Sequence, residues 1–250
     1  MAETPQWKDS MKIQLINITE HYNTLNSTKS LAENYIKNQK YNDHFLIIAD
    51  EQINGVGRNE NLWTSPKGGL WFSLVLNHLS LQKSLTLFIG YCVLKSLNEL
   101  TNSQLFQTKW PNDIYLYNKK IAGIICSQYP QFNMTSINIG INTNCSNKEL
   151  PETANSIKSA LNITIDNELY LNTIISNIMS NLSQYESMGL PLFKDYYEKH
   201  DFLKNKYINI ISGDKVHKGH YIDINNDGAL LLKNDNDQIE TVYAGSVSMF

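Results

Sequence analysis

The hydrophobic pattern of this 250-residue chain changes close to residue 200, and that change limits the possible folds more than any other feature. Before it, strand-length apolar runs such as Phe45–Ala49 alternate with stretches of helical spacing such as 83–100. From Lys206 to Phe250 the chain has about five short strand-like segments, separated by turns rich in Asn, Asp and Gly, and no helical spacing. The pattern predicts a mixed α+β unit followed by a small all-β unit.

We expect the chain to divide into three parts. Residues 1–12 form a flexible N-terminus, residues 13–203 a main domain with a mixed β-sheet flanked by helices, and residues 204–250 a small β-barrel. About 45 residues bury too little apolar surface to be stable alone, so we expect the barrel to be docked on the main domain. Strands of the main domain are expected at 12–18, 45–49, 70–76, 104–110, 114–117, 121–126 and 136–141, and helices from residue 28 and over 83–100, 168–187 and 191–200.

The composition argues against several classes of protein. Hydrophobic residues make up 42% of the chain and charged residues 18%, which is typical of a globular protein. The net charge of −3 gives no sign of the basic surface that nucleic-acid-binding proteins carry. No apolar run approaches the roughly 18 to 20 residues that cross a membrane, and no signal peptide is recognisable. Three cysteines without metal-ligand spacing indicate a reducing compartment, so we expect a cytoplasmic protein.

A glycine-containing loop after the run Phe45–Ala49 holds Arg58, the only arginine among 21 basic residues. Gly55 and Gly57 let backbone N–H groups approach an anion closely, and the guanidinium adds a planar pair of donors. The same loop contains Trp63, which can stack on a base. Its spacing matches neither the dinucleotide-binding fingerprint nor a Walker loop. Taken alone, it is more typical of a flexible surface loop.

Two further segments place polar groups at the end of a strand. Lys109 ends an apolar strand and is followed by Trp-Pro-Asn112-Asp113, so short polar side chains stand beside an ammonium group. Another strand ends in Gly140, which is followed two residues later by Asn142. Each segment alone is more typical of a surface lysine or of an ordinary strand exit than of an active site.

Together these segments resemble the biotin protein ligases. Lys109-Trp-Pro-Asn-Asp113, followed by Lys120-Ile-Ala-Gly123, is similar to the most specific sequence block of that family. The other similar segments are Asn26-Ser27-Thr28, the loop Gly55–Ser73, Gly140-Ile-Asn142, Gly213-Asp-Lys215, Asp227–Leu232 and Gly245–Ser248. They occur in the family's order over about residues 13–250, which makes a chance match improbable.

The resemblance implies a fold and a reaction. The fold is that of the biotin/lipoate ligases, similar to the class II synthetases, with a small C-terminal SH3-like barrel. The reaction has two steps, in which biotin and Mg-ATP give biotinyl-5'-AMP and pyrophosphate, and biotin then passes to a lysine of a biotin carboxyl carrier protein of the acetyl-CoA carboxylase type. Biotin and ATP with Mg²⁺ are therefore the expected substrates, and no metal ligand is assigned to the protein itself.

The resemblance also assigns roles to individual residues. Lys109 and Arg58 are the expected catalytic residues. Lys109 is expected to stabilise the charges of the biotin carboxylate and the α-phosphate, and Arg58, with its loop and Mg²⁺, the charge of the leaving pyrophosphate. The residues expected to bind biotin are Ser27, Thr28, Gln52, Gly55, Gly57, Arg58, Lys109 and Gly123. Those expected to bind ATP or the adenylate are Arg58, Trp63, Asn112 and Asn142.

The chain also departs from the family pattern. Val56 and the residues Asn59, Glu60 and Asn61 replace arginines and glycines of the loop, which leaves open whether the loop retains the adenylate less tightly. Only about 25 residues precede Asn26, too few for an N-terminal DNA-binding domain. We therefore expect a ligase that is not a repressor, with neither nucleic acid nor a membrane as a partner. A homodimer formed through sheet edges is left open.

Three other interpretations compete with this one. A lipoate–protein ligase shares the fold and reaction, but its Arg-Arg-x-Ser-Gly-Gly-Gly pattern is absent from the segment after Trp63. A non-catalytic sensor of biotin or nucleotide would not need a cation at the position of Lys109. An acyl-adenylate enzyme with a small-molecule acceptor would gain little from the C-terminal unit, whose extra surface suits a protein acceptor.

Overall fold

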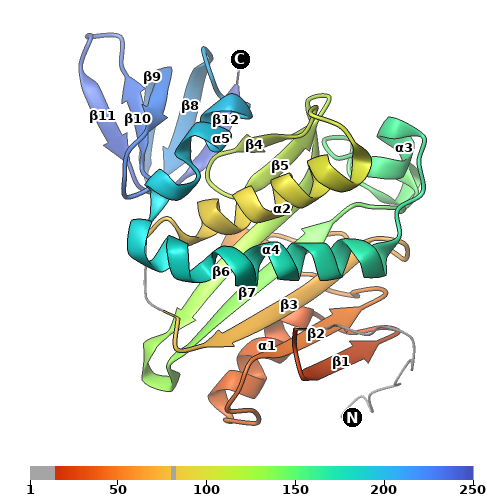
Figure 1. Ribbon diagram of the computed structural model, residues 1–250. Coiled ribbons are helices and arrows are strands. Elements are labelled where there is room, and N and C mark those ends of the chain that lie inside the picture. Colours follow the sequence, from red (N-terminus) through yellow and green to blue (C-terminus); the bar gives the residue numbers. More distant parts are fainter. Residues whose placement is uncertain (1–14, 80–82, 250) are drawn as a thin grey trace.

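The computed structural model describes residues 15–79 and 83–249 and contains two β-sheets (Figure 1). The larger sheet has seven strands in the order β1-β2-β3-β7-β6-β5-β4. Its first pair, β1 and β2, is parallel, and all other neighbours are antiparallel. The strands are β1 (Ile18–Tyr22), β2 (Phe45–Ala49), β3 (Leu70–Asn77), β4 (Gln107–Lys109), β5 (Asp113–Leu116), β6 (Lys119–Tyr129) and β7 (Met134–Ile141). The predicted α+β class is confirmed.

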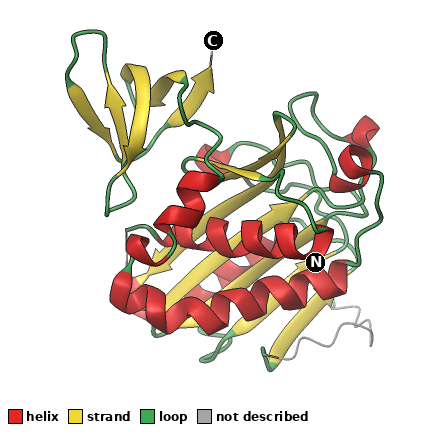
Figure 2. Ribbon diagram, turned by 45° about the horizontal axis from the view of Figure 1, so that its top comes forward, coloured by secondary structure: helices red, strands yellow, loops and turns green. Residues whose placement is uncertain are grey.

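Helices cover both faces of this sheet (Figures 1 and 2). On one face, α2 (Leu85–Thr101) and α4 (Asn167–Met188) pack together over the main core, which includes Ile137, Ile139 and Ile141 of β7. On the other face, α1 (Thr28–Lys37) packs on a smaller core around Phe45, Ile47 and Val75. Because side chains alternate along a strand, the intervening residues of β7 face the α1 side of the sheet.

Capping residues precede two of these helices. Ser27 precedes α1, and its Oγ accepts a hydrogen bond from the backbone N–H of Ser30 at 3.4 Å. Asp166 precedes α4, and its carboxylate accepts from the N–H groups of Glu168 and Leu169. Each cap satisfies N–H groups that lack a partner within the helix. The cap at Ser27 also brings the start of α1 to the edge of the site described below.

The C-terminal residues form a five-stranded antiparallel sheet, with the strand order β11-β10-β9-β8-β12. Its strands are β8 (Tyr207–Ser212), β9 (Lys215–Ile224), β10 (Leu230–Lys233), β11 (Ile239–Val242) and β12 (Ser246–Met249). Within the described residues the end strands β11 and β12 are not paired, so the expectation of a closed barrel is wrong. In that part of the chain β11 is paired only with β10 and β12 only with β8, so the sheet stays open between its two end strands.

The two sheets share one hydrophobic core. Ile208, Ile210 and Leu230 of the smaller sheet belong to the same buried cluster as α2, α4 and the larger sheet. A polar contact also joins them, since Trp110 Nε1 donates to the Gly228 carbonyl oxygen at 2.9 Å. This contact places the smaller sheet beside the turn between β4 and β5, as Figure 1 shows.

Several boundaries differ from the expected ones. The expected N-terminal segment 1–12 and the start of the strand 12–18 lie outside the described residues, and β1 begins only at Ile18. The helix expected at 191–200 is the shorter α5 (Lys194–Lys199), which follows a 3₁₀ turn that contains Pro191. The short α3 (Ile157–Leu161) was not expected. Among the described helices, none has both the length and the hydropathy needed to cross a bilayer.

Candidate active site

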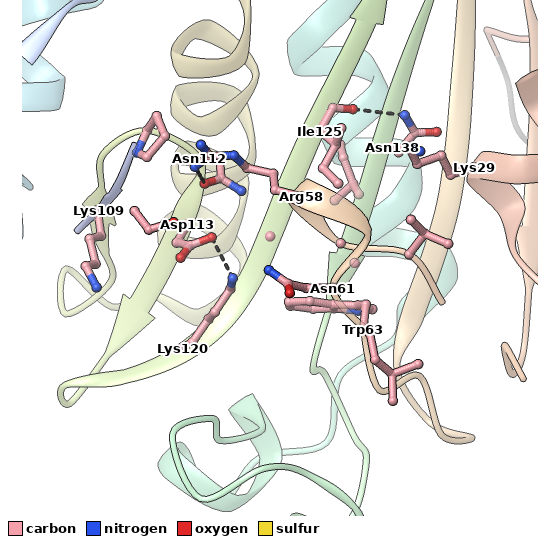
Figure 3. Close-up of a pocket in the computed structure, with 18 of the residues that line it drawn as sticks. Lys29, Arg58, Asn61, Trp63, Lys109, Asn112, Asp113, Lys120, Ile125 and Asn138 are labelled. Atoms are coloured by element: carbon pink, nitrogen blue, oxygen red, sulfur yellow. Dashed lines mark hydrogen bonds and ion pairs between the residues drawn. The ribbon is translucent and has the colours of Figure 1, made fainter. Parts of the chain in front are cut away.

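A cavity lies on the α1 side of the larger sheet, where β6, β7, the loop after β2, the turn after β4 and the start of β12 meet (Figure 3). These segments are far apart in the sequence, and the fold brings them to one place. Nine of the residues expected from the sequence line the cavity: Ser27, Thr28, Gln52, Gly57, Arg58, Trp63, Lys109, Asn112 and Gly123. Two expected residues, Gly55 and Asn142, lie outside it.

One end of the cavity carries hydroxyl and amide groups. The backbone N–H and Oγ1 of Thr28 both donate to Gln52 Oε1, at 2.8 and 3.1 Å. Gln52 Nε2 in turn donates to Ser65 Oγ at 2.8 Å. Ser27 and Thr28 are buried at the start of α1, so these groups are held in fixed directions. Such an arrangement recognises a small polar ring through a few directed hydrogen bonds.

Gly55 allows the loop to pack closely on itself and does not line the cavity. A Cβ atom at this position would lie 2.3 Å from the Trp63 carbonyl oxygen and 2.6 Å from Ser65 Oγ. The Gly55 carbonyl oxygen accepts from the Trp63 N–H at 2.8 Å, which closes the loop on itself. Only glycine permits this approach. A direct contact between Gly55 and biotin stays a prediction that its position does not support.

The indole of Trp63 lies against two glycines that face each other across β6 and β7. Gly123 and Gly140 are paired in the sheet. A Cβ atom would lie 3.1 Å from the Trp63 ring at Gly123 and 2.5 Å from Trp63 Nε1 at Gly140. Trp71 meets the same indole edge-on, with ring centroids 6.4 Å apart. The glycines therefore make room for a large aromatic side chain in the cavity wall.

Arg58 joins three parts of the structure. It lies in the loop, its Nη1 donates to Asn112 Oδ1 at 2.9 Å, and its Nη2 donates to the Gly245 carbonyl oxygen at 3.2 Å. Burial lowers the pKa of Arg58 from its ordinary value, while the charge of Asp113 opposes that shift. An arginine keeps its charge even so, because its pKa starts near 12.5 or higher. The cavity thus holds a partly buried cation with neutral hydrogen-bond partners.

Two lysines stand on either side of Asp113, and only one of them points along the cavity. Lys120 Nζ forms an ion pair with Asp113 at 2.7 Å and lies 5.0 Å from the centre of the Trp63 ring. Lys109 Nζ donates instead to Tyr115 Oη at 3.2 Å. Burial lowers the pKa of Lys109, with Asp113 acting in the opposite direction and Lys120 adding to the decrease. Figure 3 shows the Lys109 ammonium turned away from Arg58 and Trp63.

A β-bulge explains why Lys120 was not expected in the site. Gly123 and Ile125 line the cavity, so strict alternation along β6 would put residue 121 beside them and residue 120 on the core face. The register between β5 and β6 shifts at Ile114/Tyr115, so Tyr115 is paired with Lys120 and Ile114 with Ala122. Ile121 and Ala122 are then both buried, and Lys120 lies on the cavity side.

Asn142 supports the structure next to the cavity. Its backbone N–H donates to the Ile121 carbonyl oxygen at 2.8 Å, and its Nδ2 donates to the Asn155 carbonyl oxygen at 3.1 Å. Its own carbonyl oxygen accepts from the Ile157 N–H at 2.8 Å. Asn142 is 2% exposed, so it holds the segment that leads into α3. Its contact with the adenylate stays a prediction.

The sequence reasoning did not assign several residues that line the cavity: Lys29, Asp113, Lys120, Asn138, Gly245, Ser246 and Val247. Asp113 and Lys120 belong to the block that resembles the biotin protein ligases, but the spacing of that block does not show that Lys120 faces the cavity. Nothing local in the sequence indicates that the segment Gly245–Val247 reaches the cavity, because that depends on how the two sheets pack.

No metal-binding cluster is present in the described part of the chain, where no three His, Cys, Asp or Glu residues meet. Among the described residues, Asp113 is the only carboxylate that lines the cavity, and it is paired with Lys120. A divalent ion prefers several oxygen ligands. The cavity therefore suits an ion that arrives with the phosphates of a nucleotide better than one that the protein itself holds.

Comparison with known proteins gives family matches for two separate segments of the chain. The model of the biotin/lipoate A/B protein ligase family matches residues 22–144, and that of the biotin protein ligase C-terminal domain matches residues 205–249. The chain is 28% identical over 240 residues to the bifunctional ligase/repressor BirA of Bacillus subtilis (strain 168). This match covers 92% of this chain and 73% of that protein.

Two further similar proteins are also biotin protein ligases. The biotin–protein ligase of Schizosaccharomyces pombe is 25% identical over 223 residues, covering 77% of this chain and 35% of that protein. The structure of the biotin protein ligase from Aquifex aeolicus in complex with biotin and ATP superimposes with a TM-score of 0.80 at 25% identity, covering 94% of this chain and 99% of that one. The chain belongs to the biotin protein ligase family.

Proposed function

We propose that this protein is an ATP-dependent biotin–protein ligase and that biotin is activated in the cavity between α1, β6 and β7. The observation that carries the proposal is that this one cavity holds a hydrogen-bonded group of hydroxyl and amide side chains at the start of α1 and, across from it, a pair of cations near Asp113. Ser27, Thr28 and Gln52 supply the first, and Arg58 and Lys120 supply the second. Biotin matches this arrangement, with a ureido ring at one end and a carboxylate at the other.

This pair of cations suits the first step of the reaction. A biotin carboxylate oxygen attacks the α-phosphorus of ATP, the bond to the pyrophosphate breaks, and pyrophosphate leaves with the negative charge. Two anions must approach each other for this, and a fixed cation between them lowers the barrier. Lys120 and Arg58 are the cations best placed for this role, because the Lys109 ammonium points away from Arg58 and Trp63 (Figure 3) and donates to Tyr115 Oη. We therefore move the role expected for Lys109 to Lys120, and keep Lys109 as a nearby positive charge.

In the second step an acceptor amine attacks the carbonyl carbon of the biotinyl-adenylate, and AMP leaves. We propose that the acceptor is a lysine of a biotin carboxyl carrier protein. The position of Gly245, Ser246 and Val247 on the cavity wall supports a protein acceptor, since the smaller sheet then offers surface beside the reacting carbonyl. Mg²⁺ fits as an ion bound to the ATP phosphates, where it would neutralise part of the charge of the leaving pyrophosphate.

The compartment, the DNA binding and the oligomeric state of the enzyme are inferred from weaker signals. We propose that it acts in the cytoplasm, which its three free cysteines Cys92, Cys126 and Cys145 support. The absence of DNA binding stays a prediction, supported by the net charge of −3. A homodimer is a further proposal, for which β1 offers an edge strand of the larger sheet. Among the competing functions, lipoate ligation has the least support, because the named relatives are biotin ligases.

Exchange of radioactive pyrophosphate into ATP tests the proposed function. The purified protein is assayed with biotin, with lipoate and with neither. We expect exchange that requires biotin, because only a substrate that forms an adenylate reversibly supports it. Exchange that requires lipoate would assign the protein to the lipoate ligases. Biotin binding without any exchange would favour a non-catalytic sensor.

A further inference from the structure

Asn138 is a buried polar residue on the cavity wall that the reaction described so far does not use. It lies in the middle of β7, is 7% exposed, and lines the cavity together with Thr28, Lys29 and Gln52. Figure 3 places it on the side of the cavity where Lys29 lies, away from Lys109 and Lys120. Its position is therefore near the hydroxyl and amide groups at the start of α1, where the ring of biotin is proposed to bind.

The side chain of Asn138 is held in one orientation by both neighbouring strands. Its Oδ1 accepts from Ser73 Oγ of β3 at 2.8 Å and from Ser136 Oγ at 2.9 Å. Its Nδ2 donates to the Ile125 carbonyl oxygen of β6 at 3.0 Å. Two hydroxyl donors on one side and a carbonyl acceptor on the other assign the oxygen and the nitrogen of the amide without ambiguity.

This network leaves one donor unused. An amide nitrogen carries two hydrogens, and in the described part of the chain only the Ile125 carbonyl oxygen accepts from Asn138 Nδ2. A buried polar hydrogen without an acceptor is unfavourable, so such groups usually meet a ligand or an ordered water. Ile137 and Ile139 face the opposite side of the sheet, and the neighbours of Asn138 on its own face of β7 are Ser136 and Gly140.

We propose that Asn138 is a further positioning and specificity residue for biotin, and that its free Nδ2–H donates to an acceptor atom of the bicyclic ring. The ring offers two acceptors, the ureido oxygen and the thioether sulfur. Because Ser73, Ser136 and Ile125 fix the amide, the donor is already aligned before the substrate arrives. Such preorganisation favours a ring that carries an acceptor at one defined place over a ring that lacks it. This inference rests on the proposed function.

The test compares two variants that disturb the same network. Asn138→Ala removes the donor from the cavity, whereas Ser73→Ala removes one hydroxyl behind it and leaves Ser136 to hold the amide. The dissociation constants of biotin and desthiobiotin, which lacks the sulfur, are measured by calorimetry. We expect Asn138→Ala to weaken biotin binding about tenfold or more, and Ser73→Ala to weaken it less than threefold. The KM for ATP is expected to stay unchanged in both variants.

The two ligands then identify the acceptor atom. An equal loss for biotin and desthiobiotin assigns the hydrogen bond to the ureido oxygen, and a loss for biotin alone assigns it to the sulfur. Either result supports the proposal. An unchanged dissociation constant in Asn138→Ala, or an equal increase in the KM values for biotin and ATP, would overturn it.

Two controls keep the result interpretable. If Asn138→Ala does not fold, Asn138→Ser also lacks Nδ2 and keeps a polar side chain beside Ser73, so it gives the same comparison. Biotin binding and biotin-dependent exchange by the unaltered protein test the proposed function separately. If the unaltered protein neither binds biotin nor shows this exchange, the proposed function is contradicted. If the unaltered protein is active and the Asn138 variant binds biotin with an unchanged dissociation constant, only the role of Asn138 is contradicted.

Discussion

Lys120 Nζ lies 2.7 Å from Asp113 Oδ1, and this ion pair holds the lysine in the cavity beside the Trp63 indole. Asp113 comes directly after Asn112, which accepts a hydrogen bond from Arg58 at 2.9 Å. One short turn therefore orients both cations of the proposed reacting centre. The arrangement also explains how two positive charges are tolerated close together before any anionic substrate binds, since a carboxylate lies next to them.

Replacing Arg58 by lysine tests whether the planar guanidinium is needed. Lysine keeps the charge but cannot reach Asn112 and the Gly245 carbonyl oxygen at the same time. We expect Arg58→Lys to release biotinyl-adenylate into solution at least about tenfold faster, because the side chain then loses one of its two contacts, Asn112 or the Gly245 carbonyl oxygen, and holds the loop over the cavity less firmly. The measurement is chromatography of free adenylate after a single turnover. Asn112→Ala, which keeps Arg58, is expected to show a smaller increase, and a variant Arg58→Lys with unchanged release would contradict the role.

Gly123 and Gly140, which pack against Trp63, predict that alanine substitutions raise the KM for biotin by different amounts. A Cβ atom would be 2.5 Å from the indole at Gly140, 3.1 Å at Gly123, and 3.7 Å from its nearest neighbour at Gly90 in α2. We expect Gly140→Ala to displace Trp63 and raise the KM for biotin about tenfold or more, and Gly123→Ala to raise it less. Gly90→Ala is the matched control and is expected to leave the KM unchanged.

Trp63 fluorescence provides a second readout for these variants. A displaced indole becomes more exposed to water, so its emission maximum shifts to longer wavelength in Gly140→Ala. Because the chain has four tryptophans, the shift is measured against the same variant in a Trp63→Phe background. An emission maximum and a KM that match those of the unaltered protein would show that the indole does not rest on Gly140.

Much of the larger sheet is predictable from the sequence because its signals are local. The continuous apolar run Phe45–Ala49 is β2, and the cap at Ser27 begins α1. The cavity residues of the loop after β2 are predictable for the same reason, since Gly57, Arg58 and Trp63 are close in sequence. The position of Lys120 is not, because a bulge reverses the alternation of β6. The open form of the smaller sheet depends on strand pairing between distant residues, which no local pattern encodes.

Asp201 predicts a pH dependence of stability. It is 6% exposed, and burial raises its pKa to about 6, although its carboxylate accepts from the Leu203 N–H at 2.8 Å. An ordinary aspartate has a pKa near 3.9. Because the folded-state value is the higher one, the protonated carboxyl contributes stability at low pH, and that contribution is lost as the pH rises from about 4 through 6. Above that range the ionised group costs roughly 2 to 3 kcal/mol.

The variant Asp201→Asn removes this cost and keeps an oxygen that can accept from Leu203. We expect its free energy of unfolding at pH 8 to exceed that of the unaltered protein by about 1 to 3 kcal/mol, and the difference to vanish near pH 4. Denaturant unfolding at the two pH values measures both quantities. A difference of the same size at pH 4 and pH 8 would rule out the titration of Asp201 as its cause.

Pyrophosphate exchange in a lysine series tests the central claim, that biotin is activated in this cavity with Lys120 at the reacting carboxylate. The series compares Lys120→Ala with Lys119→Ala, whose exposed side chain contacts the Glu152 carbonyl oxygen outside the cavity. We predict that Lys120→Ala slows biotin-dependent exchange by about 10²- to 10³-fold, the scale on which a fixed charge acts, and that Lys119→Ala leaves it unchanged. Exchange by Lys120→Ala within a few-fold of the unaltered protein would contradict the account.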